Sequence, residues 1–237
     1  MVQLTANKPY LNMRLKFKKL GSLSYISHLD LVRTMNKIIV RAGLPLWYTE
    51  GFNPKPKMVF AAPLSIGTES MCEFMDLRLI EDISPEEVKA RLNRNMTDEM
   101  QVIDAYYTDE KLTALKWLKY SIDIKTDGSL DELARASREC LSRPALTVKK
   151  KTKPGAEEKL ADIAPLIKSA EVSVLGELLH IECVLSADAS CFLNPEYVIS
   201  ALKNNVGILA NPDITREYYT IMREEAYRED MTDFGVH

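Results

Sequence analysis

The sequence lacks the motifs by which proteins usually hold metal ions, nucleotides and dinucleotides. Its four cysteines are Cys72, Cys140, Cys183 and Cys191, and no two of them form a C-x-x-C pair. Structural zinc and iron–sulfur sites draw on closely spaced cysteines, and the chain has only three histidines. No G-x-x-x-x-G-K-[ST], G-x-G-x-x-G or H-E-x-x-H motif occurs. We therefore expect no cofactor and no metal site in this chain.

Long apolar runs are also lacking. No stretch approaches the roughly 20 apolar residues that cross a bilayer. The first residues, MVQLTANKPYLNMRLKF, lack the apolar segment of a signal peptide. These absences predict a cytoplasmic protein with reduced cysteines and without a membrane partner.

The net charge of −3 is small, but the charges are separated along the chain. Residues 1–60 hold ten Lys/Arg against two acidic residues (net +8), and residues 61–115 hold five against twelve (net −7). Residues 116–155 hold ten against five (net +5), and residues 156–237 hold six against fifteen (net −9). This separation favours a polyanion as the partner of the basic parts, unless folding interleaves the blocks and cancels their field.

Hydrophobic periodicity predicts an α+β fold whose first half has the element order β-α-β-β-α-β. The β-prone segments are 13–20, 44–50, 57–64, 72–81 and 100–107. A helix is expected from Ser27 to Gly43, because Ser27 and Asp30 have the spacing of a capping box, and another begins at Ser84-Pro85. This order is the ferredoxin-like arrangement.

The second half repeats the order. Its strands are expected at 118–126, 145–151, 170–187 (a hairpin about Gly176) and 215–222. One helix is expected to begin with a capping box of Ser129 and Glu132, and the other at Asn194-Pro195, as at Ser84-Pro85. We therefore predict two consecutive ferredoxin-like halves with antiparallel sheets.

The predicted domain boundaries follow from this repeat. The domains are residues 1–112 and 113–237, and the segment around 152–168 is an insertion without a counterpart in the first half. The acidic tail REEAYREDMTDFGVH (223–237) is expected to fray.

The run Tyr25-Ile26-Ser27-His28-Leu29-Asp30 contains the only candidates for catalysis, His28 and Asp30. A histidine at a helix N-terminus beside a serine and an aspartate can act as a general base or bind phosphate. The alternative is helix capping, which accounts for Ser27 and Asp30 but leaves His28 without a role.

Two neighbouring segments of the first half are candidates for nucleic-acid binding. Arg33, Lys37 and Arg41 recur every four residues and form one stripe along the first helix, with no acidic residue at i±4 to pair with it. Such a stripe is either a solvated face or a phosphate-binding one.

The turn GFNPKPK (51–57) follows this helix. Phe52 and Asn53 are expected at its tip with Lys55 and Lys57 beside them, which suits stacking and phosphate contact in single-stranded RNA. The alternative is a hairpin loop with a structural role only.

Lys149, Lys150 and Lys151 form a third basic cluster. It either extends the same basic groove or protects the edge of a strand against aggregation.

Several motifs, in this order, resemble the radical SAM-linked protein family, a bacterial family centred on a domain of unknown function. They are Leu15-Lys16-Phe17, SHLDL (27–31), RAGLP (41–45), GFNPKP (51–56) and Ala62-Pro63-Leu64. The resemblance covers most of residues 12–220 and implies a radical SAM protein as the partner, encoded beside this chain or fused to it. It also implies a context of RNA or ribosome maturation, and it leaves any iron–sulfur cluster to the partner.

The sequence thus predicts an accessory protein of a radical SAM partner that faces RNA or a ribosomal particle with a basic surface, and a noncatalytic role more than an enzyme. One alternative is a metal-independent RNA-processing or RNA-modifying enzyme that uses His28. Another is a pure protein-interaction partner without nucleic acid. The first prediction requires that the three basic segments gather on one surface.

Overall fold

A computed structural model describes residues 10–150 and 159–235 of the chain. The chain divides into two compact units, Met1–Leu115 with Thr232–His237, and Lys116–Met231. No helix in the described residues is long and apolar enough to cross a membrane.

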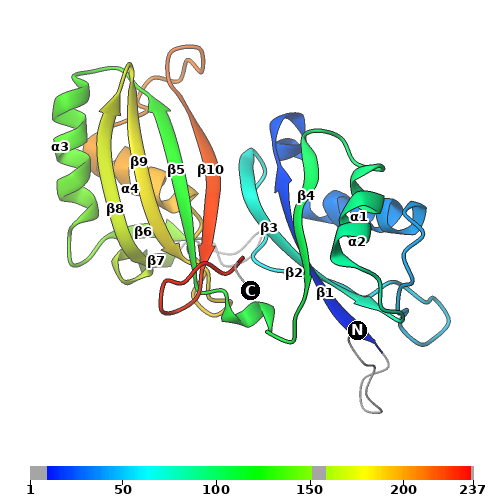
Figure 1. The fold of residues 1–237 in the computed structure, drawn as a ribbon. Helices are drawn as coiled ribbons and strands as arrows, with labels where there is room; N and C mark the ends of the chain where they lie inside the picture. Colours follow the sequence, from blue (N-terminus) through cyan, green and yellow to red (C-terminus); the bar gives the residue numbers. More distant parts are fainter. Residues whose placement is uncertain (1–9, 151–158, 236–237) are drawn as a thin grey trace. The chain divides into compact units, whose positions relative to one another are not determined.

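The first unit is a ferredoxin-like domain. Its elements are β1 (Leu11–Lys19), η1 (Gly21–Tyr25), α1 (His28–Arg41), β2 (Met58–Phe60), β3 (Thr68–Leu79), α2 (Pro85–Asn93), β4 (Met100–Tyr107) and η2 (Leu112–Ala114). The strand order is β4-β1-β3-β2, and all neighbouring strands are antiparallel. Figure 1 shows α1 and α2 together on one face of this sheet.

The core of the first unit lies between the sheet and these helices. Alternate residues of β1, among them Leu15 and Phe17, are fully buried there against Met35 and Ile39 of α1. The apolar side chains that recur every second residue in the strand therefore pack in one layer with those that recur about every 3.6 residues in the helix. Both helix starts are capped as expected, since the Ser27 hydroxyl accepts a hydrogen bond from the Asp30 amide and the Ser84 hydroxyl one from the Glu87 amide.

On its other face, the sheet of the first unit carries a buried charged group. Arg14 has no exposed surface, and its guanidinium binds Asp76 (Nε to Oδ1, 2.8 Å) and Glu110 (Nη1 to Oε2, 3.1 Å). It also lies 4.7 Å from the ring centroid of Phe234, which is itself fully buried and meets the Phe74 ring edge-on at 5.0 Å. The expectation that the tail frays is therefore wrong for its described part, because Phe234 packs on this sheet.

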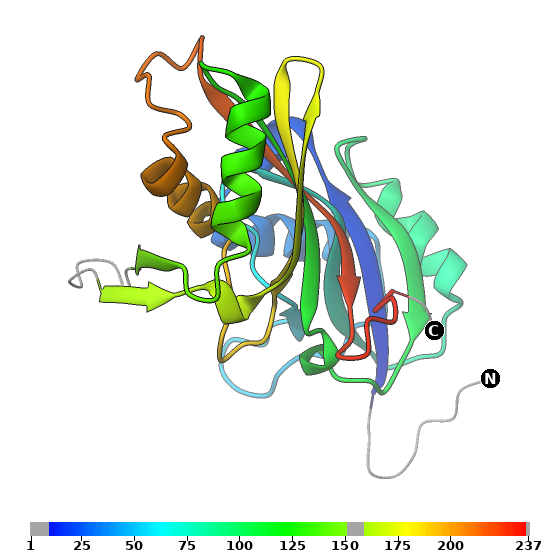
Figure 2. The ribbon, with the colours of Figure 1, turned by 90° about the vertical axis from the view of Figure 1, so that its left-hand side faces the viewer.

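The second unit repeats the topology. Its elements are β5 (Trp117–Lys125), α3 (Leu130–Leu141), β6 (Thr147–Lys150), β7 (Lys159–Asp162), η3 (Ala164–Leu166), β8 (Ile167–Leu175), β9 (Leu178–Ser186), α4 (Glu196–Val206) and β10 (Tyr218–Tyr227). The strand order β10-β5-β9-β8 matches β4-β1-β3-β2 of the first unit. Two ferredoxin-like halves with antiparallel sheets, the predicted fold class, are thereby confirmed. In Figure 2 the antiparallel pair of β6 and β7 stands apart from this sheet.

Several local expectations differ from the structure. Ser129 makes no side-chain cap, although its carbonyl accepts the first helical hydrogen bond from the Leu133 amide. Helix α4 begins at Glu196 rather than at Pro195, and the Asn194 side chain accepts from the Glu196 amide at 3.1 Å. The segment 44–50 forms only isolated bridges and no strand. The part of the expected insertion that is described includes β7, which pairs with β6.

Candidate nucleic-acid interface

The basic stripe of α1 points away from the core. Leu31, Met35, Ile38 and Ile39 face inward, so the helical period turns Arg33, Lys37 and Arg41 outward, and all three are exposed. The described residues contain no ion pair of Lys37 or Arg41.

Arg33 differs from the other two stripe residues. Its Nη1 donates to Asp30 Oδ1 at 3.2 Å, one helical turn away. No acidic residue stands at i±4 of the stripe, as expected, but Asp30 stands three residues before Arg33, and an i,i+3 pair serves as well as an i,i+4 pair. Both side chains are more than half exposed, so this pair contributes little to stability and can open.

His28 is the first residue of α1, and its side chain is exposed. Its ring packs edge-on against Phe60, with the centroids 5.4 Å apart. Asp30, the expected partner, is occupied by Ser27 Oγ (2.7 Å) and Arg33, and these hydrogen bonds, the one from Ser27 first, lower the pKa of its carboxyl. Ser27 thus caps the helix by accepting from the Asp30 amide, and the Asp30 carboxylate is oriented toward Ser27 and Arg33.

The loop after α1 is held at its base by the backbone. The Thr49 amide donates to the Lys55 carbonyl at 3.0 Å, and the Lys55 amide donates to the Thr49 hydroxyl at 3.1 Å. Tyr48 and Pro56 form an antiparallel bridge above them. These bonds close the loop, so its tip is presented on a fixed base.

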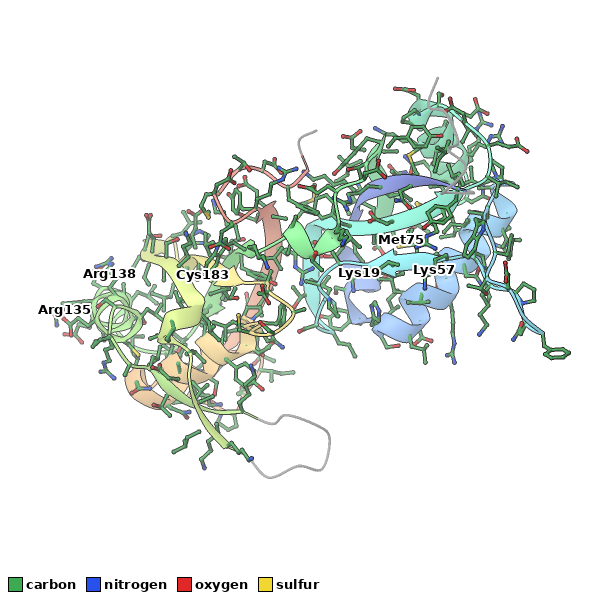
Figure 3. The ribbon with its side chains drawn as sticks, turned by 90° about the horizontal axis from the view of Figure 1, so that it is seen from below. Lys19, Lys57, Met75, Arg135, Arg138 and Cys183 are labelled. Atoms are coloured by element: carbon green, nitrogen blue, oxygen red, sulfur yellow. The ribbon has the colours of Figure 1, made fainter. Side chains whose placement is uncertain are left out.

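The tip itself is fully open to solvent. Phe52 has a relative exposure of 113%, the largest of any apolar residue described, and Asn53, Lys55 and Lys57 are exposed as well. Neither lysine has an ion pair within the described residues. Figure 1 shows this loop, between α1 and β2, extending past the end of α1, and Figure 3 labels Lys57 on the segment that leads into β2.

A stack of two aromatic rings and a guanidinium lies at Trp47, just before the loop in the sequence. The Arg78 guanidinium lies 4.1 Å from the Tyr10 ring centroid and 5.3 Å from that of Trp47, and the two rings are 5.5 Å apart. The Trp47 amide also donates to the Arg78 carbonyl at 2.8 Å. Sequence reasoning missed Arg78, because only the pairing of residues 46–47 with the end of β3 brings it here.

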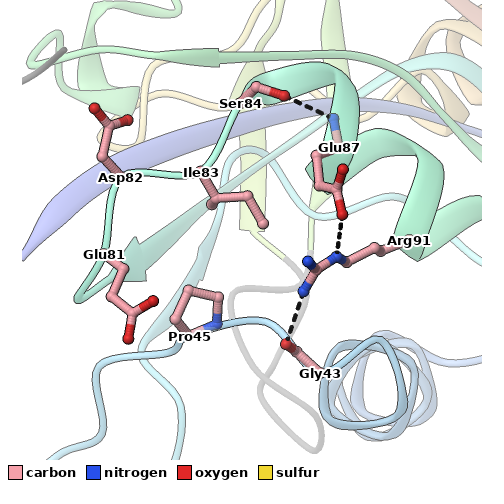
Figure 4. A pocket seen from close by; sticks show the side chains of 8 residues that line it. All are labelled: Gly43, Pro45, Glu81, Asp82, Ile83, Ser84, Glu87 and Arg91. Atoms are coloured by element: carbon pink, nitrogen blue, oxygen red, sulfur yellow. Dashed lines mark hydrogen bonds and ion pairs between the residues drawn. The ribbon is translucent and has the colours of Figure 1, made fainter.

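An acidic pocket lies near the C-terminal end of α1 (Figure 4). It has a volume of about 610 Å³ and is lined by Gly43, Pro45, Glu81, Asp82, Ile83, Ser84, Glu87 and Arg91. Arg91 donates to Glu87 Oε1 at 2.7 Å and to the Gly43 carbonyl at 3.2 Å. With its one cation engaged and three carboxylates on its wall, this pocket repels a polyanion.

The third basic cluster lies in the second unit. Lys149 is exposed, but Lys150 donates to the Phe192 carbonyl at 3.2 Å and lies 5.5 Å from the Tyr197 ring centroid. Strand alternation in β6 explains why the two neighbours point in different directions. Lys151 lies outside the described residues.

The described residues hold no group of three His, Cys, Asp or Glu side chains that could bind a metal ion. All four cysteines are free thiols. Burial raises the pKa of the Cys183 thiol to about 12 and also raises that of Cys140, which keeps both groups protonated and unreactive.

Comparison with known proteins gives a family and a fold. Residues 12–195 match the model of a family described as an uncharacterized protein conserved in bacteria (DUF2344). No curated protein matches the chain. A crystal structure of a Cbf5–Nop10–Gar1 complex matches over 92% of this chain and 50% of the other, with 11% identity and a TM-score of 0.51. This chain thus spans half of that neighbour, and the likeness concerns the fold.

A second structural match has a much lower score. It is the crystal structure of an unknown protein from Galdieria sulphuraria, with 7% identity, coverage of 90% and 98% of the two chains and a TM-score of 0.26.

Proposed function

This chain belongs to the DUF2344 family of uncharacterized proteins conserved in bacteria, and we propose that it is an accessory protein that binds single-stranded RNA. The binding surface is the α1 stripe together with the loop that follows it. Its residues are Arg33, Lys37, Arg41, Phe52, Asn53, Lys55 and Lys57. This set is called the RNA-facing surface below.

The observation that carries the proposal is the tip of the loop. An aromatic ring without any cover, Phe52, stands beside two lysines that have no ion pair in the described residues. A single exposed apolar residue is common on protein surfaces, but this ring has its full surface free for stacking and lies beside lysines that can contact phosphates, and this combination supports the proposal. Base stacking on an aromatic ring with lysines on the adjacent phosphates is the standard way of holding single-stranded RNA.

The charges of the neighbourhood support the same ligand. The RNA-facing surface has five cationic side chains, and the acidic side chains along residues 27–57 are Asp30 and Glu50. Asp30 is occupied by Ser27 and Arg33, so the excess of positive charge is concentrated on Lys37, Arg41 and the loop. Such an excess attracts phosphates and makes the affinity depend on salt.

The proposal includes a radical SAM protein as the second partner, on the sequence resemblance alone. A metal cluster would then reside in that protein, and this chain would position the RNA for it. Asn53, which can donate and accept hydrogen bonds at the loop tip, is the residue we assign to contacts with base edges.

The first experiment measures binding of a fluorescein-labelled oligouridine to the full chain by anisotropy at fixed low salt. Removing the ring with Phe52→Ala should weaken binding by about 1–3 kcal/mol, the contribution of one stacked base. Ile80→Ala, which truncates an exposed apolar side chain outside the surface, is the matched control and should have no effect. Equal affinities of the wild type and Phe52→Ala would refute the role of the loop.

A second variant separates binding from catalysis. His28→Ala should bind the oligouridine with nearly wild-type affinity, since His28 belongs to neither the stripe nor the loop. If the wild type cleaves or modifies RNA and His28→Ala abolishes that turnover, the chain is an enzyme and the accessory role is wrong.

A further inference from the structure

Arg78 of β3 lies on the face of the first unit's sheet that is opposite to α1 and α2 (Figure 1). Strand alternation fixes this direction, because its neighbours Leu77 and Leu79 are fully buried in the core beneath the helices. Across the sheet Arg78 pairs with Asn12 of β1, and both residues are partly exposed. The guanidinium is therefore within reach of a ligand on this face.

Two aromatic rings and a lysine surround this guanidinium. Its carbon lies 4.1 Å from the ring centroid of Tyr10 and 5.3 Å from that of Trp47. The Trp47 amide donates to the Arg78 carbonyl at 2.8 Å, and the Trp47 carbonyl accepts from the Lys57 amide at 3.4 Å, so the three segments meet here. Met58 packs against the core, and alternation therefore turns the exposed Lys57 to the face of Arg78.

The donors of Arg78 are left available. Within residues 10–150 and 159–235 its guanidinium makes no hydrogen bond and no ion pair. Asp76, two residues earlier on the same face of β3, is bound by Arg14 through both of its oxygens, at 2.8 Å and 3.1 Å. The contacts with the rings hold the arginine in place without using its N–H groups. Such an arginine loses little freedom when it binds a phosphate through two of them.

We propose that the Arg78 cluster, which consists of Tyr10, Trp47, Lys57 and Arg78, binds a phosphate of the same single-stranded RNA as the loop, an inference that rests on the proposed function. Continuity argues for this ligand, since Lys57 belongs both to the RNA-facing surface and to the cluster. Charge argues for it as well, because the cluster contributes two cations and no carboxylate. The RNA strand then continues from the loop onto the sheet face opposite α1.

The test measures the salt dependence of binding of a fluorescein-labelled oligouridine of about 12 nucleotides to the full chain. Arg78→Gln should weaken binding about tenfold at low salt and reduce the salt slope by about 0.7, the value for one phosphate on a single strand. Arg78→Lys retains the charge and should keep the wild-type slope. The matched control is Arg94→Gln, at an exposed arginine that follows α2, and it should change neither quantity.

A second variant separates phosphate binding from support of the loop. Tyr10→Leu removes a ring that contacts the guanidinium but leaves every charge of the cluster, so it should weaken binding without changing the slope. If Arg78→Gln leaves the slope at the wild-type value, or if Tyr10→Leu lowers it as much as Arg78→Gln does, Arg78 only holds the loop and the inference is wrong.

This inference and the proposed function fail in different ways. A wild type that does not bind oligouridine refutes both. Binding that Phe52→Ala weakens and Arg78→Gln leaves unchanged refutes only the phosphate contact of Arg78, and the RNA-facing surface then ends at the loop.

Discussion

A buried carboxylate in the second unit should control the stability of that unit. Glu217 is 5% exposed. Its Oε1 accepts hydrogen bonds from the Thr126 hydroxyl (2.6 Å) and the Asp127 amide (2.7 Å), and its Oε2 accepts one from the Asn211 amide. The Thr126 hydroxyl accepts in turn from the Leu209 amide at 3.0 Å. One side chain thereby joins the turn after β5 to the segment before β10.

Glu217→Ala removes the acceptor of three donors, of which the Thr126 hydroxyl belongs to a buried residue, so we expect the free energy of unfolding to fall by about 3 kcal/mol at pH 7. Glu217→Gln keeps one acceptor oxygen and should lose about half of this. With the slopes usual for urea, the midpoint of Glu217→Ala should be lower by roughly 1–2 M.

The effect should depend on pH in a defined direction. Burial raises the pKa of Glu217, but the hydrogen bonds from Thr126, Asp127 and Asn211 outweigh it, so the pKa in the folded chain is lowered. A group with a lowered pKa contributes its full stability above the unfolded value of about 4.3 and loses it as the pH falls through the folded value. The difference between the wild type and Glu217→Gln should therefore be constant above about pH 5 and shrink below about pH 4.

Urea unfolding from pH 7 to pH 3 measures this difference, and hydrogen exchange of the Asp127 and Asn211 amides localises it. A loss below about 1 kcal/mol for Glu217→Ala at pH 7 would refute the reasoning, because an average point substitution already costs about that much without breaking such a network. A difference that grows as the pH falls would contradict the sign of the pKa shift.

Three further predictions concern the core of the first unit and the helix caps of both units, all measured by urea unfolding. Arg14→Met should cost about 3–5 kcal/mol, since it leaves Asp76 without its buried partner; a neutral effect would contradict this. Ser84→Ala should cost about 1 kcal/mol, whereas Ser129→Ala should cost close to nothing, because only Ser84 makes the cap hydrogen bond; equal costs would argue against the difference in caps. Met75→Ala should cost about 2–5 kcal/mol, as expected for a fully buried side chain, and a loss below that range would mean that the site collapses around the gap.

Local signals predicted the fold well. The helix starts at Ser27 and Ser84 depend on residues within one turn, and both caps form as the sequence indicates. The alternating strands lie close to their expected bounds, because a half-buried strand must keep its period of two. Two repeats of β-α-β-β-α-β then leave the ferredoxin-like order as the simplest antiparallel arrangement.

The wrong predictions are of two kinds. In one, several local conformations have similar energies, and in the other, the structure depends on residues far away in the sequence. At Ser129 the backbone bond to Leu133 starts the helix without the side chain, so a sequence match to a capping box did not guarantee a cap. Phe234 is buried by Arg14 and Phe74, more than a hundred residues earlier in the chain, which no local pattern reveals.

The sequence predicted which side chains of the candidate site are exposed, but not which partners they bind. The exposed positions of Lys37 and Arg41 follow from the helical period, and those of the loop from its turn chemistry. The partners of two basic residues could not be predicted. Arg33 pairs with Asp30, which depends on the rotamers of both side chains. Lys150 binds the carbonyl of Phe192, a residue that lies far from it in the sequence.

The salt dependence of RNA affinity tests the central claim most directly. For single strands the logarithm of the binding constant falls with the logarithm of salt concentration by about 0.7 for each phosphate neutralised. The double variant Lys55→Ala/Lys57→Ala should therefore reduce the slope for oligouridine by about 1.4 relative to the wild type. The control Lys111→Ala, at an exposed lysine outside the surface, should keep the wild-type slope. A wild-type affinity that does not change with salt, or a slope that the double variant leaves unaltered, would contradict RNA binding by this surface.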